Sequence, residues 1–328
     1  MKRGYKILLT VLIVVLLVVI IGPFLIPVAP LEGLQPPAAL ARENSRFVTS
    51  PFAGTDGIDF HYRRDGEGEP AFVLLHGFAS SLFVWDEVFD QFAAQAVTFA
   101  FDRPPFGLSE RLVPGDWEDA NPYSPDAGVE QLMTLLDGQQ IDRAILVGNS
   151  AGGTLAMRAA LAYPQRFDGL ILISPAVYGG GGTPGFVRPL MRTPQLQRLG
   201  PLLARRIATW GNSLEEAAYH DLSTLTPEQR ATARLGLQVQ DWDRALWALT
   251  SASQASDLPD RLDELELPVL IITGDDDRVV PTEQSIRLAG ELPNAELVVL
   301  PACGHVPQEE CEGAFMDAVN AWLNEQGW

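Results

Sequence analysis

The sequence predicts an α/β fold in which a mostly parallel sheet carries helices on both faces. Short, continuous apolar runs recur along the chain, and strands that are buried on both faces have this pattern. Helix-like stretches such as 151–163 and 307–324 lie between the runs, as in repeated strand–helix–strand units. Six runs are predicted as strands of the sheet: 72–75, 97–101, 144–147, 170–173, 269–272 and 297–300.

The chain begins with an apolar segment that is long enough to cross a membrane. Lys2, Arg3 and Lys6 precede an apolar run over 7–28. As a helix this run would be about 33 Å long, which exceeds the ~30 Å hydrocarbon core of a bilayer. The cationic flank favours the cytoplasmic side for the N-terminus. We expect residues 1–28 to be a single-pass membrane anchor, with the rest of the chain outside the cytoplasm.

A cleaved signal peptide, and hence a secreted protein, is the alternative for this segment. The nearest small-x-small cleavage pattern is Ala39-Leu40-Ala41, which lies far behind the apolar run and after a Pro-rich stretch. Residues 29–45 are rich in Pro and Ala and lack periodicity, so they are predicted to be a linker.

Two segments form the predicted α/β core, residues 46–175 and 260–328. The first opens with runs near 47–49 and 58–63 that alternate between apolar and polar residues. This alternation indicates a pair of strands with one solvated face, so we expect an antiparallel hairpin at the edge of the sheet.

The strand–helix rhythm stops between residues 176 and 259. This stretch contains no strand-like run, but its helical segments carry apolar and aromatic residues. We predict that it forms a helical cap, inserted before the last two strands of the sheet. The glycine-rich segment 179–185 is predicted to be a mobile joint between the cap and the core.

Composition excludes several functions. The 23 Lys and Arg residues face 42 Asp and Glu residues, which gives a net charge of −19. This acidity argues against nucleic-acid binding, because phosphate groups require a basic surface. The only lysines are Lys2 and Lys6. Chemistry that depends on a Schiff-base lysine, a phosphate-binding lysine or a kinase lysine is therefore excluded.

The sequence predicts no metal site. Cys303 and Cys311 are too few for a thiolate zinc site or a disulfide framework. We expect them to be buried free thiols, with a bridge in an oxidising compartment as the alternative. None of the four histidines has the i, i+4 spacing of helical metal sites: His61, His76, His220 and His305.

The strongest chemical motif is a Gly-x-Ser-x-Gly sequence at 148–152. It follows the predicted strand 144–147 and opens a predicted helix, which is the setting of a nucleophile elbow. The turn is so tight that side chains two residues before and after the serine would clash, and Gly148 and Gly152 avoid this. Because the serine lies at a helix N-terminus, developing negative charge is stabilised there. Ser150 is the predicted nucleophile.

A serine hydroxyl needs a base, and the base needs a carboxylate to orient it. His305 follows the last predicted strand and is the candidate base. Three consecutive carboxylates, Asp275, Asp276 and Asp277, follow the predicted strand 269–272. The chain order of serine, acid and histidine matches that of nucleophile-elbow enzymes. Spacing alone does not choose among the three aspartates.

Over residues 47–323 the chain resembles the α/β-hydrolase superfamily. The family pattern of Gly-x-x-Asp, followed by a short apolar pair and Pro, occurs at 274–281. It assigns the acid to Asp277 and leaves the two preceding aspartates as turn residues. The resemblance thus implies a capped α/β-hydrolase fold with Ser150, Asp277 and His305 as its catalytic triad.

The resemblance also implies an oxyanion hole. The sequence His76-Gly77-Phe78 is similar to the family's His-Gly segment. In that family the residue after His-Gly and the residue after the nucleophile each donate a backbone N–H. Carried over, these are Phe78 and Ala151. His76 is then expected to be structural, and Asp102 is expected to order the loop that follows the next strand.

The type of nucleophile limits the reaction. Haloalkane dehalogenases and epoxide hydrolases of this fold carry Asp at the elbow, and dienelactone-type hydrolases carry Cys. Ser150 implies acyl transfer through an acyl-enzyme, with His305 moving the proton. This chemistry needs no cofactor, and the expected partner is a small-molecule ester or a related acyl substrate.

Two enzyme functions and one binding function follow from these motifs. The Gly-Asn-Ser-x-Gly-Gly and Cys-Gly-His segments are similar to those of hydrolases that cleave C–C bonds in ring-fission products. However, Val306 follows His305 where that subgroup commonly has Trp, and residues 76–79 lack its Gly-Pro-Gly continuation. We expect a carboxylic-ester hydrolase for a small or medium hydrophobic substrate. C–C hydrolysis is the second candidate. A membrane-tethered ligand-binding module without catalysis is the alternative of another class.

Overall fold

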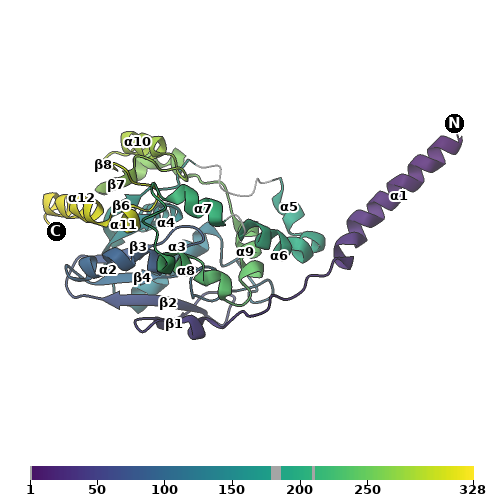
Figure 1. Ribbon diagram of the computed structural model, residues 1–328, viewed down its shortest axis with the longest axis horizontal. Coiled ribbons are helices and arrows are strands. Elements are labelled where there is room, and N and C mark those ends of the chain that lie inside the picture. The colour runs from purple at the N-terminus through teal and green to yellow at the C-terminus, as the bar shows by residue number, and fades with distance from the viewer. Residues whose placement is uncertain (1, 179–185, 209–210) are drawn as a thin grey trace.

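The computed structural model describes residues 2–178, 186–208 and 211–328 (Figure 1). Its centre is an eight-stranded sheet in the order β1-β2-β4-β3-β5-β6-β7-β8. Strand β2 pairs antiparallel with both of its neighbours, β1 and β4, and all other neighbouring strands pair parallel. The strands are β1 Arg46–Ser50, β2 Ile58–Asp65, β3 Ala71–Leu75, β4 Thr98–Phe101, β5 Ala144–Asn149, β6 Phe167–Ile173, β7 Val269–Gly274 and β8 Ala295–Leu300.

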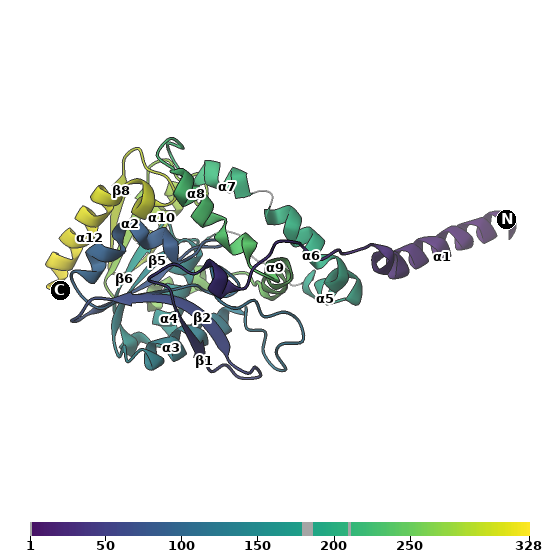
Figure 2. The same cartoon turned by 60° about the horizontal axis from the view of Figure 1, so that its bottom comes forward.

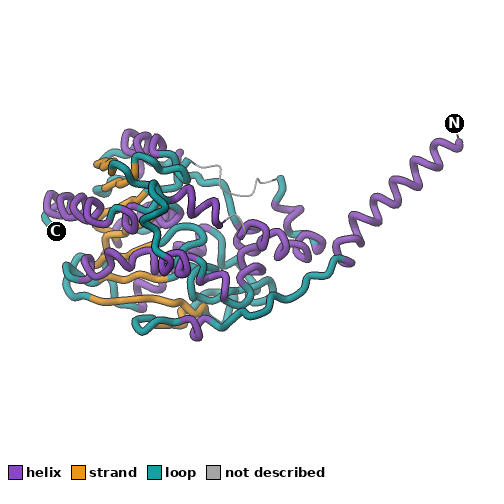
Figure 3. The backbone as a smooth tube through the Cα atoms, viewed as in Figure 1, coloured by secondary structure: helices purple, strands orange, loops and turns teal. Residues whose placement is uncertain are grey.

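Each apolar run predicted as a strand overlaps one strand of this sheet, and the predicted edge hairpin is β1 and β2. The continuous runs of the central strands arise because both faces of the sheet are covered there (Figure 3), whereas the run 297–300 lies in the edge strand β8, which is only partly buried. In β3, for example, Val73 and Leu75 contribute to one hydrophobic cluster, and Phe72 and Leu74 contribute to the other. The predicted α/β fold with a mostly parallel sheet is therefore confirmed.

Helices cover the two faces of the sheet. The helices α3 Pro125–Gly138, α4 Ala151–Ala162 and α10 Thr282–Glu291 contribute to one cluster. On the other face lie α2 Asp86–Ala93, α11 Pro307–Glu310 and α12 Glu312–Gln326.

The segment predicted as the cap is helical in its described part. Its helices are α5 Arg188–Met191, α6 Pro194–Ala208, α7 Gly211–Ala218, α8 Pro227–Ala233 and α9 Trp242–Ala252. They follow β6 and precede β7, as predicted for an insertion before the last two strands. The predicted glycine-rich joint at 179–185 lies outside the described residues.

The N-terminal helix α1, Lys2–Leu25, projects away from the rest of the chain (Figures 1 and 2). Within its span Gly4–Leu25, an 18-residue stretch has a mean hydropathy of 3.2, and no residue of that stretch is buried. This one helix is long and apolar enough to cross a membrane. It ends three residues before the predicted end at Val28, because Pro27 lacks an N–H and disfavours helical conformation in Ile26.

Residues 29–45, predicted as a linker, pack against the cap, and we call them the strap. Gln35 donates its backbone N–H to the carbonyl of Gln238 (2.8 Å) and accepts from the N–H of Gln240 (3.1 Å). Leu31 and Leu34 pack on a hydrophobic cluster of α6 and α9. The strap thus joins the N-terminal helix to the cap through contacts of its own.

Candidate active site

Ser150 occupies a strained turn between β5 and α4. Its backbone has φ 52° and ψ −116°, a conformation that costs free energy in a residue with a side chain. A Cβ atom on Gly152 would lie 2.0 Å from the carbonyl oxygen of Leu75, and one on Gly148 would lie 2.6 Å from the nitrogen of Gly153. The two glycines are therefore required by close backbone approach, as the Gly-x-Ser-x-Gly motif predicts.

His305 and Asp277 form a hydrogen-bonded pair at the carboxyl ends of the strands. The Nδ1 atom of His305 lies 2.8 Å from Oδ2 of Asp277. The other carboxylate oxygen accepts the backbone N–H groups of Val279 and Val280, each at 2.9 Å. Both side chains are buried. Because Asp277 accepts a hydrogen bond from the Nδ1–H group of His305, Nε2 of the neutral imidazole can act as an acceptor.

The two other aspartates of the run make different contacts. Asp276 pairs with His220 at 2.9 Å and with Arg278, on the exposed side of the turn. Oδ1 of Asp275 accepts the backbone N–H of Cys303 at 3.4 Å. The geometry therefore supports Asp277 as the partner of His305.

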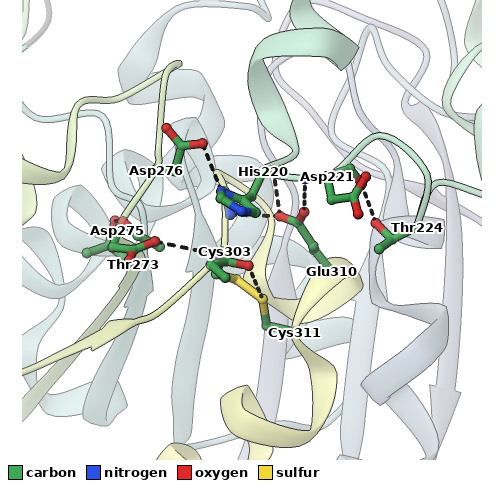
Figure 4. The surroundings of a disulfide bond; sticks show 12 residues. His220, Asp221, Thr224, Thr273, Asp275, Asp276, Cys303, Glu310 and Cys311 are labelled. Atoms are coloured by element: carbon green, nitrogen blue, oxygen red, sulfur yellow. Dashed lines mark hydrogen bonds and ion pairs between the residues drawn. A yellow bond between two sulfur atoms is a disulfide. The ribbon is translucent and has the colours of Figure 1, made fainter.

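A disulfide joins Cys303 to Cys311 (Figure 4), so the expectation of free thiols is wrong. His305 lies between the two cysteines in the sequence. The loop after β8 and the short helix α11 bring the two Cα atoms to 6.2 Å, which is within disulfide range. Glu310 adds a second restraint, because its Oε2 accepts the N–H of Gly304 (2.7 Å) and of His220 (3.0 Å). The loop that carries His305 is thus held on both sides.

The same three side chains place potential metal ligands close together. Atoms of Cys303, Glu310 and Cys311 lie within 4.8 Å of one another. Both sulfur atoms belong to the disulfide, so the group offers one carboxylate as a free donor, which is a poor metal site.

Asn149 is a residue of the site that sequence reasoning did not single out. Its Nδ2 donates to the backbone carbonyls of His305 (3.1 Å) and Ile173 (3.3 Å), and its side chain is buried. It ties the turn of Ser150 to the loop of His305. The available signal was its place immediately before the serine of the motif.

His76 has a structural environment, in agreement with the prediction. Its Nε2 accepts the backbone N–H of Arg103 at 2.9 Å, so Nδ1 carries the proton and donates to the carbonyl of Gly77 at 2.8 Å. Burial, together with the charge of Arg103, lowers the pKa of His76 to about 3. The ring is neutral at physiological pH, and both of its nitrogens are occupied.

Asp102 orders the loop after β4, as expected. Its carboxylate accepts the backbone N–H groups of Leu82 and Leu108, both at 2.6 Å. It also pairs with Nδ1 of the buried His61 at 2.6 Å, and Nε2 of His61 lies 2.7 Å from the Ser45 hydroxyl. These contacts hold the end of the strap against the core.

The predicted oxyanion donors are Phe78, in the loop after β3, and Ala151, which directly follows Ser150. Phe78 lines the cavity described below. Ala151 is the first residue of α4, and the N–H of a first helical residue has no acceptor within the helix. The donor role of these two N–H groups stays a prediction of the α/β-hydrolase resemblance.

A cavity of about 520 Å³ lies between the core and the cap, and Ser150 and His305 both line it. Residues from the loop after β3, from α9 and from the His305 loop give it a largely apolar wall. The apolar lining residues include Phe78, Val84, Phe106, Leu225, Trp242, Leu246 and Val306.

The ionisable side chains on this wall have hydrogen-bond partners within the protein. Arg111 donates to backbone carbonyls of the loop before it. Arg234 binds Glu215 through two hydrogen bonds of 2.9 and 3.0 Å. Burial raises the pKa of Glu309 to about 8, and Tyr219 donates to it at 2.8 Å. Glu309 is therefore mostly protonated and uncharged at neutral pH.

A family model described as "alpha/beta hydrolase fold" matches residues 70–311. A 2-hydroxy-6-oxononadienedioate/2-hydroxy-6-oxononatrienedioate hydrolase of Paraburkholderia phymatum is 32% identical, over 86% of this chain and 96% of that protein. A 2-hydroxy-6-oxo-6-phenylhexa-2,4-dienoate hydrolase of Burkholderia cepacia is 29% identical, over 83% and 93%.

Solved structures show the same fold. A thermophilic esterase from Thermogutta terrifontis matches with a TM-score of 0.65 and 22% identity, over 87% of this chain and 99% of that one. A meta-cleavage product hydrolase from Pseudomonas fluorescens matches with a TM-score of 0.61 and 26% identity, over 85% and 98%.

Proposed function

Since this chain belongs to the α/β-hydrolase fold family, we propose that it is a serine hydrolase with Ser150, His305 and Asp277 as its catalytic triad. One observation carries the proposal. Ser150, in its strained turn, lines the same cavity as His305, and His305 is hydrogen bonded to Asp277.

In this mechanism the Ser150 hydroxyl attacks a substrate carbonyl while Nε2 of His305 accepts its proton. Asp277 stabilises the imidazolium that forms. The backbone N–H groups of Phe78 and Ala151 donate to the developing oxyanion. His305 then protonates the leaving group, and a water molecule, activated by the same imidazole, hydrolyses the acyl-enzyme.

The most favourable substrate is an uncharged carboxylic ester with a small or medium hydrophobic acyl group. A mostly apolar wall favours an apolar ligand. A substrate carboxylate would need a cation to compensate its desolvation. Among the described lining residues, the Nη groups of Arg111 donate to backbone carbonyls and Arg234 pairs with Glu215.

Hydrolysis of a C–C bond in a ring-fission product is the second candidate. It is favoured by the relatives named above, two of which are dienoate or dienedioate hydrolases with 29% and 32% identity to this chain. The same triad can serve both reactions. They differ in the groups that hold the rest of the substrate, and here the engaged arginines argue for the ester.

The substrate class can be tested with p-nitrophenyl acetate, butyrate, hexanoate and octanoate beside one ring-fission dienoate. We expect kcat/KM to rise from acetate to a medium chain, since each added methylene is worth ~0.8 kcal/mol when buried, and we expect the dienoate to turn over at least tenfold less well. A dienoate that exceeds every ester in kcat/KM would reverse the ranking.

We further propose that α1 anchors the protein in a membrane, with the hydrolase outside the cytoplasm. Two observations support this orientation. The helix has a cationic N-terminal flank and a fully exposed apolar span. The Cys303–Cys311 disulfide belongs to an oxidising compartment. Secretion after cleavage behind α1 is the alternative.

Protease treatment of intact cells tests this orientation. In Gram-negative cells the outer membrane must first be permeabilised. We expect the hydrolase domain to be digested while a cytoplasmic marker protein is spared, and both to be digested in lysed cells. Full protection would contradict the orientation, and enzyme free of membranes with a new N-terminus near residue 42 would support secretion.

A further inference from the structure

One surface of the cap combines exposed apolar side chains with arginines. It is formed by residues 186–206, which include α5 and most of α6, and we call it the basic apolar face. The exposed fractions of Phe186, Leu190 and Leu203 are 87%, 57% and 45%. The segment carries five arginines and no Asp or Glu, in a chain with a net charge of −19. Large exposed apolar residues in one place mark an interaction surface.

This face lies beside the end of the N-terminal helix, as both views show (Figures 1 and 2). Side chains spaced along α6 donate to backbone carbonyls at the end of α1 and the start of the strap. These hydrogen bonds run from Gln195 to Ile20 (3.2 Å), from Arg198 to Ile26 (3.5 Å) and from Arg205 to Ala29 (2.9 Å).

The contact with Ile20 sets the depth of α6 relative to a bilayer. Ile20 lies five residues before the end of α1 at Leu25, so its carbonyl is about 7.5 Å inside the end of the helix at ~1.5 Å per residue. Amphipathic helices on membranes bury their apolar face ~5–10 Å into the boundary between headgroups and acyl chains. If α1 crosses the membrane, the start of α6 is therefore at that boundary.

We propose that the basic apolar face rests on the bilayer that α1 crosses, on the side of the hydrolase domain. Phe186, Leu190 and Leu203 reach the acyl chains, and the exposed Arg192 and Arg198 lie among anionic headgroups. This inference rests on the proposed membrane anchor. Electrostatic attraction to anionic lipids supports it, since this segment is basic although the chain as a whole is strongly acidic.

The face is also connected to the candidate active site. Under α6 lies α9, whose Trp242 and Leu246 belong to the hydrophobic cluster beneath the face and also line the cavity. The cap elements that touch the membrane are thus one layer away from the substrate. An ester dissolved in the bilayer fits this arrangement better than a freely soluble one.

Depth-dependent fluorescence quenching tests the proposal in the full-length protein. Because both native cysteines are in the disulfide, a single introduced thiol can be labelled with an environment-sensitive dye. Phe186→Cys and Leu203→Cys place the dye on the basic apolar face. Ile286→Cys on α10, which is 50% exposed, is the control on the hydrolase core, and Leu12→Cys reports on the anchor.

The labelled proteins are reconstituted in phosphatidylcholine–phosphatidylglycerol vesicles, with and without an acyl-chain spin label. We expect strong quenching at 12 and at least threefold more quenching at 186 and 203 than at 286. If the dye at position 12 is quenched but the dyes at positions 186 and 203 are quenched no more than the dye at position 286, the membrane contact is overturned and the anchor is left intact. Absence of quenching at 12 would overturn the anchor and this inference with it, without bearing on the triad.

Discussion

Replacing Ser150 by alanine is expected to lower kcat by a factor on the order of 10⁶, which is the loss found when a serine hydrolase loses its nucleophile. The alanine removes the only atom that forms the acyl bond in the proposed mechanism. Its methyl group fits the space of the serine side chain, so folding should be unaffected. The measurement is turnover of a p-nitrophenyl ester, with labelling by a fluorophosphonate probe as a second readout.

The probe separates the enzyme from the binding module, because only an activated serine reacts with it. Wild type should be labelled, Ser150→Ala should not, and Ser223→Ala, at an exposed cap position, should be labelled like wild type. Labelling that survives in Ser150→Ala would place the nucleophile elsewhere. A wild-type protein that is folded but never labelled would favour a ligand-binding module.

The second large effect is expected from Asp277→Asn, with a loss of about 10⁴ in kcat. The amide can donate to Nδ1 of His305, which fixes the tautomer whose Nε2 carries a proton and cannot accept one from Ser150. Asparagine keeps an oxygen that can accept the N–H groups of Val279 and Val280, so the turn should persist.

Asp275→Asn is the matched control, since its carboxylate faces the N–H of Cys303 rather than the imidazole. We expect it to retain most of the activity, with unchanged circular dichroism in both variants. If Asp275→Asn lost activity and Asp277→Asn kept it, the acid of the triad would have been assigned to the wrong residue.

The fold could be predicted from the sequence because the central strands β3 to β7 are buried on both faces. In such a strand most residues on both faces must be apolar, as Phe72 and Val73 illustrate on opposite sides of β3. The turn of Ser150 was equally predictable, because close backbone approach leaves glycine as the residue that fits at 148 and 152.

Other features depend on contacts between distant segments and were out of reach. The bridge between Cys303 and Cys311 requires the loop after β8 to fold back toward α11, and two cysteines eight residues apart do not specify this path. The hydrogen bond from Arg111 to the carbonyl of Gly236 and the raised pKa of Glu309 also follow from the packing of the cap on the core. Such properties decide which substrate fits, so specificity is harder to predict from a sequence than the presence of catalytic motifs.

The pairing of Gln35 with the cap matters for anyone who prepares a water-soluble form of this enzyme. Cutting the chain at residue 46, where the first strand begins, would strip Leu31 and Leu34 from the cluster around Trp242 and open that cluster to solvent. Removing only α1 would leave these contacts in place. A form that begins at Ile26 therefore keeps the contacts between the strap and the cap.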